Sequence, residues 1–456
     1  MLSASLNVVL PEGPLVTWYG DDFTGSAAVL EAMEFAGLSS ILLLAPPEPD
    51  ELSVLSRFRG IGIAGKARAK PKEWISRVLP RVFSAMAQIG APLAHYKICS
   101  TLDSSPSTGS IGAAIDLAIP HLGGIWHPVL TAAPPIGRYQ AFGNLFAVHG
   151  ARHHRLDRHP VMSRHPVTPM DESDVALHLA RQTSRSIGLI DLLDLRDAPN
   201  ALARERAAGC ELVSIDMLSS DDMVAAGELI WQNRGERLLA IGSQGVENAL
   251  IRYWQAAGAL ESPSSPRIRR VSQLVAVSGS ASDVTAAQLV CAEACGFEVI
   301  VLDSVSCLDP SCAEQAMQSA VAAALSVLAR GKSPIVASVR GPDDPQLTVC
   351  RNAAAILGLS REGASERLGA CLGQILRRVQ AASGIERLVV AGGDTSGDVC
   401  TAIGIHALTA IGHSVPGAAL LAAHGQDLRE MSFDVALKGG QMGPTEYFAR
   451  MRDGCP

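Results

Sequence analysis

Short apolar runs alternate with alanine-rich stretches of helical pattern along most of this chain. The first such runs are residues 38–45, 60–65, 93–100 and 126–133, and helical patterns such as residues 72–88 fall between several of them. Parallel strands need long crossover connections, which are usually helices, and those helices cover both faces of the sheet. The alternation therefore predicts an α/β fold.

The same alternation starts again after residue 272. Its expected strands are residues 273–279, 296–303, 333–341 and 387–393. Between the two sets, residues 259–270 are rich in proline, serine and charge, which is typical of a linker. We therefore expect two α/β domains, residues 1–258 and 271–456, each a mostly parallel sheet flanked by helices, with an active-site cleft between them.

Charge and composition exclude several classes of protein. The net charge of −7 and the sequence pI of about 6.0 do not favour a nucleic-acid partner. Mean hydropathy is +0.21, yet no apolar run approaches the ~18 residues of a membrane helix, and the N-terminus lacks the basic region of a signal peptide. Ten cysteines without a CxxC pair predict reduced thiols and a cytoplasmic location. The sequence does not determine the oligomeric state, and a homo-oligomer is one alternative.

In sheets of this kind, ligands bind beyond the carboxyl ends of the strands. Asp21 and Asp22 lie in such a turn, and a helix cap explains one carboxylate but not two. The pair can hold hydroxyls, hold a metal, or accept a proton from a hydroxyl. Residues 97–112 add an ammonium, a carboxylate and many hydroxyls, which suit a polyhydroxy acid, although an elaborate helix cap is the alternative.

Residues 278–288 and 392–404 are two further turns of this kind. Both join an apolar run to a helical pattern, and their small residues let backbone amides approach a phosphate. Simple tight turns are the alternative, since neither stretch matches a named phosphate-binding motif. Residues 60–67 nearly spell a P-loop, but Ala67 replaces the required hydroxyl and the glycines fall within the expected strand. The residues thus point to phosphoryl transfer from a nucleotide to a hydroxyl of a sugar acid.

Residues 152–170 interrupt the alternation with prolines, histidines and arginines. We interpret this stretch as a long surface excursion from the first domain. A metal site that uses His149 and His153 is the alternative, but the spacing fits no common site and the prolines disfavour a helix. Metal ligands therefore stay unassigned.

Seven motifs occur in order, at residues 20–25, 97–105, 134–139, 164–170, 278–282, 392–397 and 437–443. Together they resemble the four-carbon acid sugar kinase family over nearly the whole chain. The resemblance implies that the N-terminal domain binds the sugar acid and the C-terminal domain binds ATP. It also implies that the terminal hydroxyl of a 3-oxo-tetronate, threonate or erythronate type of acid is phosphorylated. Residues 105–109 depart from the family, because many members have a basic residue and a glycine there, and this leaves the particular acid open.

These observations predict three sets of site residues. Asp22 is expected to act as the base and Asp21 to hold substrate hydroxyls, although the sequence does not order the two. The expected substrate-binding residues are Arg68, Lys97, Asp103, Ser104, Ser105, Arg138 and Arg164, with Lys97 and Arg138 favoured for the carboxylate. The expected nucleotide-binding residues are Ser280, Ser282, Gly392, Gly393, Asp394, Thr395, Ser396, Gly397, Gly439, Gly440 and Gly443. Mg²⁺ is expected with ATP to offset the phosphate charge.

Two other functions compete with the kinase. The first is an NAD(P)-dependent dehydrogenase acting on a sugar acid, because Asp303 ends an expected strand, where an acid that binds ribose could lie. The missing GxGxxG motif and the two adjacent aspartates count against it. The second is a sugar-acid sensor without activity, for which no DNA-binding segment is visible.

Overall fold

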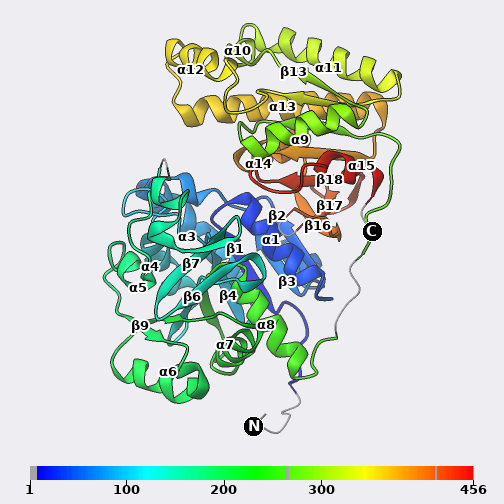
Figure 1. The fold of residues 1–456 in the computed structure, drawn as a ribbon. Helices are drawn as coiled ribbons and strands as arrows, with labels where there is room; N and C mark the ends of the chain where they lie inside the picture. Colours follow the sequence, from blue (N-terminus) through cyan, green and yellow to red (C-terminus); the bar gives the residue numbers. More distant parts are fainter. Residues whose placement is uncertain (1–7, 166, 262–265, 416–417, 455–456) are drawn as a thin grey trace. The chain divides into compact units, whose positions relative to one another are not determined.

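The computed structural model describes residues 8–165, 167–261, 266–415 and 418–454. The chain folds as two units, Met1–Ser264 and Ser265–Pro456, each with helices flanking its sheet (Figure 1). This confirms the predicted two-domain α/β fold. The linker proposed at 259–270 includes residues 262–265, which lie outside the described residues.

The main sheet of the first unit is parallel throughout its described strands, in the order β2-β3-β1-β4-β11-β5-β10-β9. Its strands are β1 (Val16–Gly20), β2 (Ser40–Leu43), β3 (Gly60–Ile63), β4 (Leu93–Lys97), β5 (His127–Leu130), β9 (Ile187–Ile190), β10 (Leu212–Ile215) and β11 (Leu238–Gly242). Strands β9, β10 and β11 were not predicted from the sequence. Apolar runs of four or five residues cannot be told from buried helix segments by periodicity alone.

The helices of the first unit include the one predicted at residues 72–88. They are α1 (Phe23–Glu34), α2 (Leu52–Leu55), α3 (Lys72–Ile89), α4 (Ile111–Leu122), α5 (Val175–Ala180), α6 (Ala198–Ala207), α7 (Ser220–Gln232) and α8 (Gly245–Ala256). A separate antiparallel sheet contains β6 (Arg138–Ala141), β7 (Asn144–His149) and β8 (Arg152–Arg155). The stretch interpreted as an excursion therefore begins as a strand, because β8 pairs with β7.

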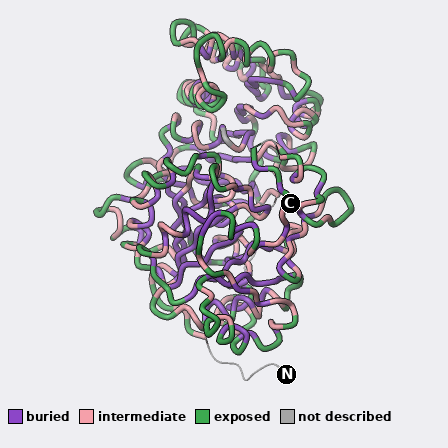
Figure 2. Tube along the Cα trace, turned by 90° about the vertical axis from the view of Figure 1, so that its left-hand side faces the viewer, coloured by how far each residue is buried: buried purple, intermediate pink, exposed green. Residues whose placement is uncertain are grey.

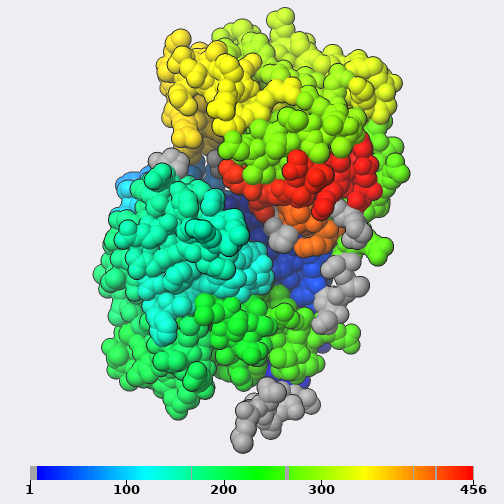
Figure 3. Space-filling view, in the orientation of Figure 1, coloured from blue at the N-terminus to red at the C-terminus, as the bar shows by residue number. Residues whose placement is uncertain are grey.

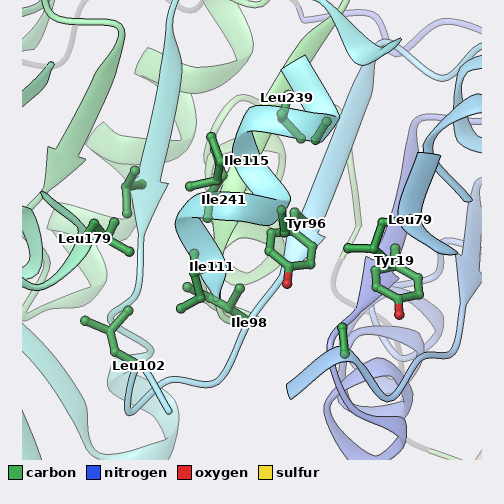
Figure 4. Close-up of a cluster of buried hydrophobic side chains, with 14 of the residues drawn as sticks. Tyr19, Leu79, Tyr96, Ile98, Leu102, Ile111, Ile115, Leu179, Leu239 and Ile241 are labelled. Atoms are coloured by element: carbon green, nitrogen blue, oxygen red, sulfur yellow. The ribbon is translucent and has the colours of Figure 1, made fainter. Parts of the chain in front are cut away.

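Helices on both faces of the sheet explain why all of β1 is buried. Trp18 and Tyr19 point to opposite faces, since side chains alternate along a strand. A Cβ added to Gly62 would lie 2.2 Å from the Trp18 indole, so the glycines of β3 make room for that ring. On the other face, Tyr19 stacks on Tyr96 with ring centroids 6.2 Å apart (Figure 4). The glycine run at residues 60–65 thus serves packing.

The second unit has a mixed sheet in the order β13-β14-β12-β15-β18-β17-β16, parallel from β13 to β18 and antiparallel from β18 to β16. Its strands are β12 (Val275–Ser278), β13 (Phe297–Val301), β14 (Ser333–Ala337), β15 (Arg387–Ala391), β16 (Ala407–Gly412), β17 (Leu420–His424) and β18 (Glu430–Lys438). Its helices are α9 (Asp283–Ala294), α10 (Ser304–Leu308), α11 (Ala313–Ala329), α12 (Gln346–Ile356), α13 (Arg361–Ser383), α14 (Gly393–Ile403) and α15 (Tyr447–Asp453).

A buried ion pair aligns the two central strands of this sheet. The Arg387 side chain on β15 donates to both carboxylate oxygens of Asp434 on β18, at 2.9 and 3.0 Å. The buried segments run through the interior of each unit, and exposed segments follow its outside (Figure 2). No helix in the described part of the chain is both long and apolar enough to span a bilayer.

Candidate functional site

Three neighbouring strands of the first sheet, β3, β1 and β4, run parallel and end at the same edge. Asp21 and Asp22 follow β1, Arg68 lies in a short 3-10 turn after β3, and Lys97 ends β4. The Asp21 amide donates to the Lys97 carbonyl at 2.8 Å, and the Arg68 amide donates to the Asp21 carbonyl at 2.9 Å. The structure thus brings four of the predicted residues together.

Arg68 lies between the two adjacent carboxylates. Its Nη2 donates to Asp21 Oδ1 and to Asp22 Oδ1, both at 2.6 Å, and its Nε donates to Asp21 Oδ2 at 3.2 Å. The Asp21 side chain is 3% exposed, whereas that of Asp22 is 28% exposed. Burial raises the pKa of Asp21, and the charge of Arg68 opposes that shift. The guanidinium therefore offsets the repulsion between the carboxylates and leaves Asp22 as the accessible one.

Asp22 also caps α1, because its Oδ1 accepts a hydrogen bond from the Gly25 amide at 3.0 Å. A Cβ added to Gly25 would lie 2.3 Å from Asp22 Oδ1 and 2.5 Å from Lys97 Nζ, so only glycine fits there. Lys97 is 2% exposed and donates to the Ile98 carbonyl at 2.9 Å. Among the described residues, every hydrogen bond of the Asp22 carboxylate uses Oδ1, which leaves Oδ2 for a ligand.

The loop after β4 carries a chain of polar contacts. The Cys99 thiol lies 2.9 Å from the Thr101 hydroxyl, which donates to Asp103 Oδ1 at 2.8 Å. Burial raises the pKa of Cys99 to about 11, so this thiol is neutral near pH 7. Cys99 and Thr101 were not among the predicted site residues, although both lie in the polar stretch at residues 97–112 that indicated a site.

Ser104 and Ser105 interact mainly with the protein itself. Ser104 is 4% exposed, and its Oγ partners, each at 2.9 Å, are Leu102 O, His178 Nε2 and Gln182 Nε2. Burial lowers the pKa of His178 to about 4, so its ring is neutral near pH 7. Ser105 Oγ accepts a hydrogen bond from the amide three residues later at 3.0 Å. Both hydroxyls therefore shape the loop, whose Leu102 belongs to the buried cluster beneath it (Figure 4).

Arg138 has unused hydrogen-bond donors. Its Nη1 makes long hydrogen bonds to Ile136 O at 3.3 Å and Gly137 O at 3.2 Å, and its buried Nε has no partner. Burial lowers the pKa of Arg138, and the negative charge of Asp103, in the loop after β4, opposes that shift. Arg164 is exposed and makes no hydrogen bond with these residues in the described part of the chain.

The histidines of the excursion lie on strands and loops, not on a helix. His149 ends β7, and His153 lies on β8. The rings of His149 and His154 each pack against His159, with centroids 5.4 and 5.9 Å away. His159 Nδ1 accepts from two backbone amides at 3.2 Å, so that nitrogen is occupied. Within the described ranges, no group of three histidine, cysteine, aspartate or glutamate residues is arranged to hold a metal.

In the second unit, the loops after β12, β15 and β18 meet at one edge of the sheet, since these strands are parallel neighbours. The Gly279 amide donates to the Ala391 carbonyl, and the Gly392 amide donates to the Lys438 carbonyl, both at 2.9 Å. A Cβ added to Gly279 would lie 2.3 Å from Thr395 Oγ1, which shows how closely the first two loops approach.

Side chains of α9 and of its N-cap donate hydrogen bonds to the loop after β18. Ser282 caps α9, and its Oγ also donates to the Gly440 carbonyl at 2.5 Å. Thr285 Oγ1 donates to the same carbonyl at 2.9 Å. Gln288 Nε2 donates to three successive carbonyls of residues 442–444 at 2.9–3.1 Å. The segment that leads into α15 lies against α9 on the surface (Figure 3).

Thr285 and Gln288 were not among the predicted site residues. Ser282, Thr285 and Gln288 follow one another at intervals of three residues, which places them on one side of α9, and this spacing is the sequence signal that could have indicated them. A Cβ added to Gly440 would lie 2.5 Å from Ser280 Oγ, so a side chain there would displace that hydroxyl, and the φ of +86° at Gly443 favours glycine.

The predicted residues 392–397 form the start of α14. Gly392 has a φ of +139°, and the helix begins at Gly393 and includes Gly397. Ser396 is 1% exposed, and its Oγ donates to the Gly392 carbonyl at 2.7 Å. The side chain of Asp394 lies outside the described part. A helix N-terminus presents free amides and a positive dipole, which suit a phosphate.

Two family models match the chain. A sugar-binding N-terminal domain matches residues 16–250, and a nucleotide-binding C-terminal domain matches residues 275–448. A 3-oxo-isoapionate kinase of Paraburkholderia graminis is 44% identical over 97% of this chain and 95% of its own length. Two 3-oxo-tetronate kinases, of Pseudomonas savastanoi and Methylobacterium radiotolerans, are 26% and 28% identical over 96% and 95% of this chain, covering 96% and 97% of their own lengths.

Solved structures show the same fold. A Salmonella typhimurium structure is 24% identical, covers 95% of this chain and 98% of its own, and has a TM-score of 0.75. A Haemophilus influenzae structure is 22% identical, covers 96% of this chain and 99% of its own, and has a TM-score of 0.71.

Proposed function

The chain belongs to the four-carbon acid sugar kinase family, and we propose that it transfers the γ-phosphate of ATP to the terminal hydroxyl of 3-oxo-isoapionate. The 44% identity to a 3-oxo-isoapionate kinase, against 26–28% for the 3-oxo-tetronate kinases, supports this acid over the tetronates. The observation that carries the chemistry is Asp22, whose Oδ2 is open beside the Arg68 guanidinium in the unit that matches a sugar-binding domain.

We propose that Asp22 orients the acceptor hydroxyl and takes its proton as the new phosphate ester forms. Asp21 is nearly fully buried against Arg68, and this favours Asp22 over Asp21 as the proton acceptor. The substrate carboxylate is assigned to Arg138, whose Nε has no partner among the described residues, with Lys97 as the second cation. The other predicted residues, Asp103, Ser104, Ser105 and Arg164, remain proposals for substrate binding.

The phosphates of ATP are assigned to the amides of the three glycine loops of the second unit. Closely packed glycines and a helix N-terminus support that placement. We also propose that ATP enters as its Mg²⁺ complex. Mg²⁺ usually keeps several waters and binds through substrate phosphates and one or two carboxylates, so it needs no cage of protein ligands. When bound, it offsets the negative charge of the phosphates. The free thiols of the nine described cysteines support a cytoplasmic location.

Gly440→Val is expected to weaken ATP binding by at least tenfold. The new side chain would push against Ser280 Oγ, which lies 2.5 Å from the position of its Cβ, and would separate the loops after β12 and β18. Isothermal titration of ATP would measure the change. Gly425→Val is the matched control, because a Cβ added there would meet only Asp427 Oδ1, at 3.6 Å. Unchanged ATP affinity in a folded Gly440→Val protein would remove this loop from the nucleotide site.

The substrate proposal is tested by ADP release with 3-oxo-isoapionate, 3-oxo-tetronates, threonate and erythronate. We expect kcat/KM to be highest with 3-oxo-isoapionate, and a higher value with any other acid would overturn the assignment. NAD and NADP are expected to leave the thermal stability unchanged, whereas ATP should raise it. Asp303, which suggested a dehydrogenase, caps α10 and accepts hydrogen bonds from the Ser306 amide and hydroxyl at 3.1 and 2.7 Å.

A further inference from the structure

A lysine ends the strand that leads into the third glycine loop. Lys438 is the last residue of β18, and its side chain is fully buried. Its Nζ donates to Thr285 Oγ1 at 3.0 Å and to the Gly439 carbonyl at 3.2 Å. The ammonium therefore joins the first turn of α9 to the loop that follows β18, at the point where the three glycine loops meet.

Among the described residues, the groups in contact with this ammonium carry no negative charge. They are the Thr285 hydroxyl from α9, the Gly439 carbonyl from its own loop and the Tyr447 ring from α15, whose centroid is 5.8 Å away. In the described ranges, no carboxylate forms an ion pair with Lys438. Burial alone lowers the pKa of Lys438 to about 8.

Several carboxylates lie on the neighbouring elements. Glu293 of α9 pairs with Arg340, and Asp453 of α15 pairs with Arg452. Asp434 lies on the same strand, but both of its oxygens accept from Arg387. The side chain of Asp394, on α14, lies outside the described part. A buried charge without a counterion is costly, so a chain that needed only packing here would be served better by an apolar side chain.

We propose that the buried ammonium of Lys438 is positively charged without a counterion in the nucleotide-free protein, and that the phosphates of the bound nucleotide act as its counterion. The inference rests on the proposed nucleotide site and adds a residue that acts on it without being exposed. Low dielectric around the ammonium strengthens its attraction to charge nearby. Lys438 also positions the loop, because it holds the Gly439 carbonyl and the Thr285 hydroxyl that in turn holds Gly440.

Opposite pH dependences are expected for binding and for folding. Nucleotide affinity needs the protonated lysine, so it should fall as the pH rises through about 8. The stability of the fold depends on pH in the opposite direction. The pKa of Lys438 is lower in the folded protein than in the unfolded chain, so at pH values between these two pKa values the unfolded chain binds more protons. The free energy of unfolding of the nucleotide-free protein should therefore rise with pH across that interval. A lysine paired with a carboxylate would show neither change.

The full chain and its Lys438→Met variant are compared by isothermal titration with ATP at pH 7.5 and 9.5, where the nucleotide phosphates are already ionised. For the unmodified protein we expect Kd to rise on the order of tenfold over this interval. For Lys438→Met we expect Kd at pH 7.5 to be weaker by a similar factor and to change little with pH. Thermal unfolding without nucleotide should show Lys438→Met as stable as the unmodified protein, or more so, at pH 7.5.

The possible results separate this inference from the proposed function. If the unmodified protein fails to bind ATP at pH 7.5, the nucleotide site itself is wrong. If it binds with a Kd that is the same at both pH values, or if Lys438→Met binds ATP equally well, the proposal that the Lys438 ammonium pairs with the nucleotide phosphates is refuted. If Lys438→Met does not fold, the pH series on the unmodified protein decides alone. A counterion supplied by Asp394 would make the apo protein no more stable as the pH rises, and that result would also overturn the proposal.

Discussion

Asp22→Asn is expected to lower kcat by roughly 10²- to 10⁴-fold, the usual contribution of a general base. Asparagine keeps the size of the side chain and caps a helix about as well as aspartate, so α1 should remain intact. What it loses is the charge that accepts the proton of the substrate hydroxyl. Steady-state ADP release at saturating ATP and acid would measure kcat, and titration should show an ATP affinity close to that of the unmodified protein.

A matched control comes from another helix of the same unit. Asp174 caps α5 by accepting from the Leu177 amide at 2.9 Å, and Asp174→Asn makes the same chemical change outside the site. We expect its kcat to stay within about twofold of normal, because it removes only a charge at a cap. Near-normal turnover in a folded Asp22→Asn protein would show that Asp22 is not the base, and Asp21→Asn would then be the variant to measure.

Arg138→Ala is expected to raise the KM for the acid by about 10- to 150-fold, since a charge-assisted hydrogen bond contributes roughly 1.5–3 kcal/mol. Among the described residues, the hydrogen bonds of the Arg138 guanidinium use Nη1 alone, so Nη2 is left as a donor to a carboxylate. The KM for ATP should change little, because Arg138 belongs to the unit that matches the sugar-binding domain. Arg138→Lys should recover only part of the effect, as a lysine cannot bind a carboxylate through two parallel donors.

Arg152→Ala is the control for this measurement. Arg152 is exposed on β8, in the same antiparallel sheet as Arg138, and lies outside the proposed site. Its KM for the acid should equal that of the unmodified protein. If Arg138→Ala and Lys97→Ala both leave the KM unchanged for every acid tested, the carboxylate is bound elsewhere in the chain.

Much of the fold could be predicted because short apolar runs and helical periodicity are local features of the sequence. Each strand expected from a β-branched run, from residues 38–45 to residues 387–393, corresponds to a strand of the structure. Helix α3 was expected one residue short of its observed end. Strands β9, β10 and β11 were not recognised, because four or five buried residues carry no period of their own. Strands β16, β17 and β18 were also not predicted.

The candidate site divides in a similar way. The motifs located the loops, since a polar turn after an apolar run is a local signal, and Asp21, Asp22 and Gly440 all lie in such turns. The partners of these residues come from distant parts of the chain. Nothing near Arg68 indicates that its guanidinium joins two carboxylates 46 and 47 residues earlier. Thr285 likewise contacts a carbonyl 155 residues away.

The sequence by itself determined the fold class, the division into a sugar-acid half and a nucleotide half, and the loops that carry polar groups. Periodicity and turn chemistry are local properties, and they can be recognised without knowing which strands pair. Only the tertiary structure decided that β4 lies between β1 and β11, that Ser104 is turned toward His178, and that Lys438 is buried without a counterion among the described residues. Those facts depend on which surfaces are removed from water, and burial is settled by packing between segments that the sequence keeps far apart.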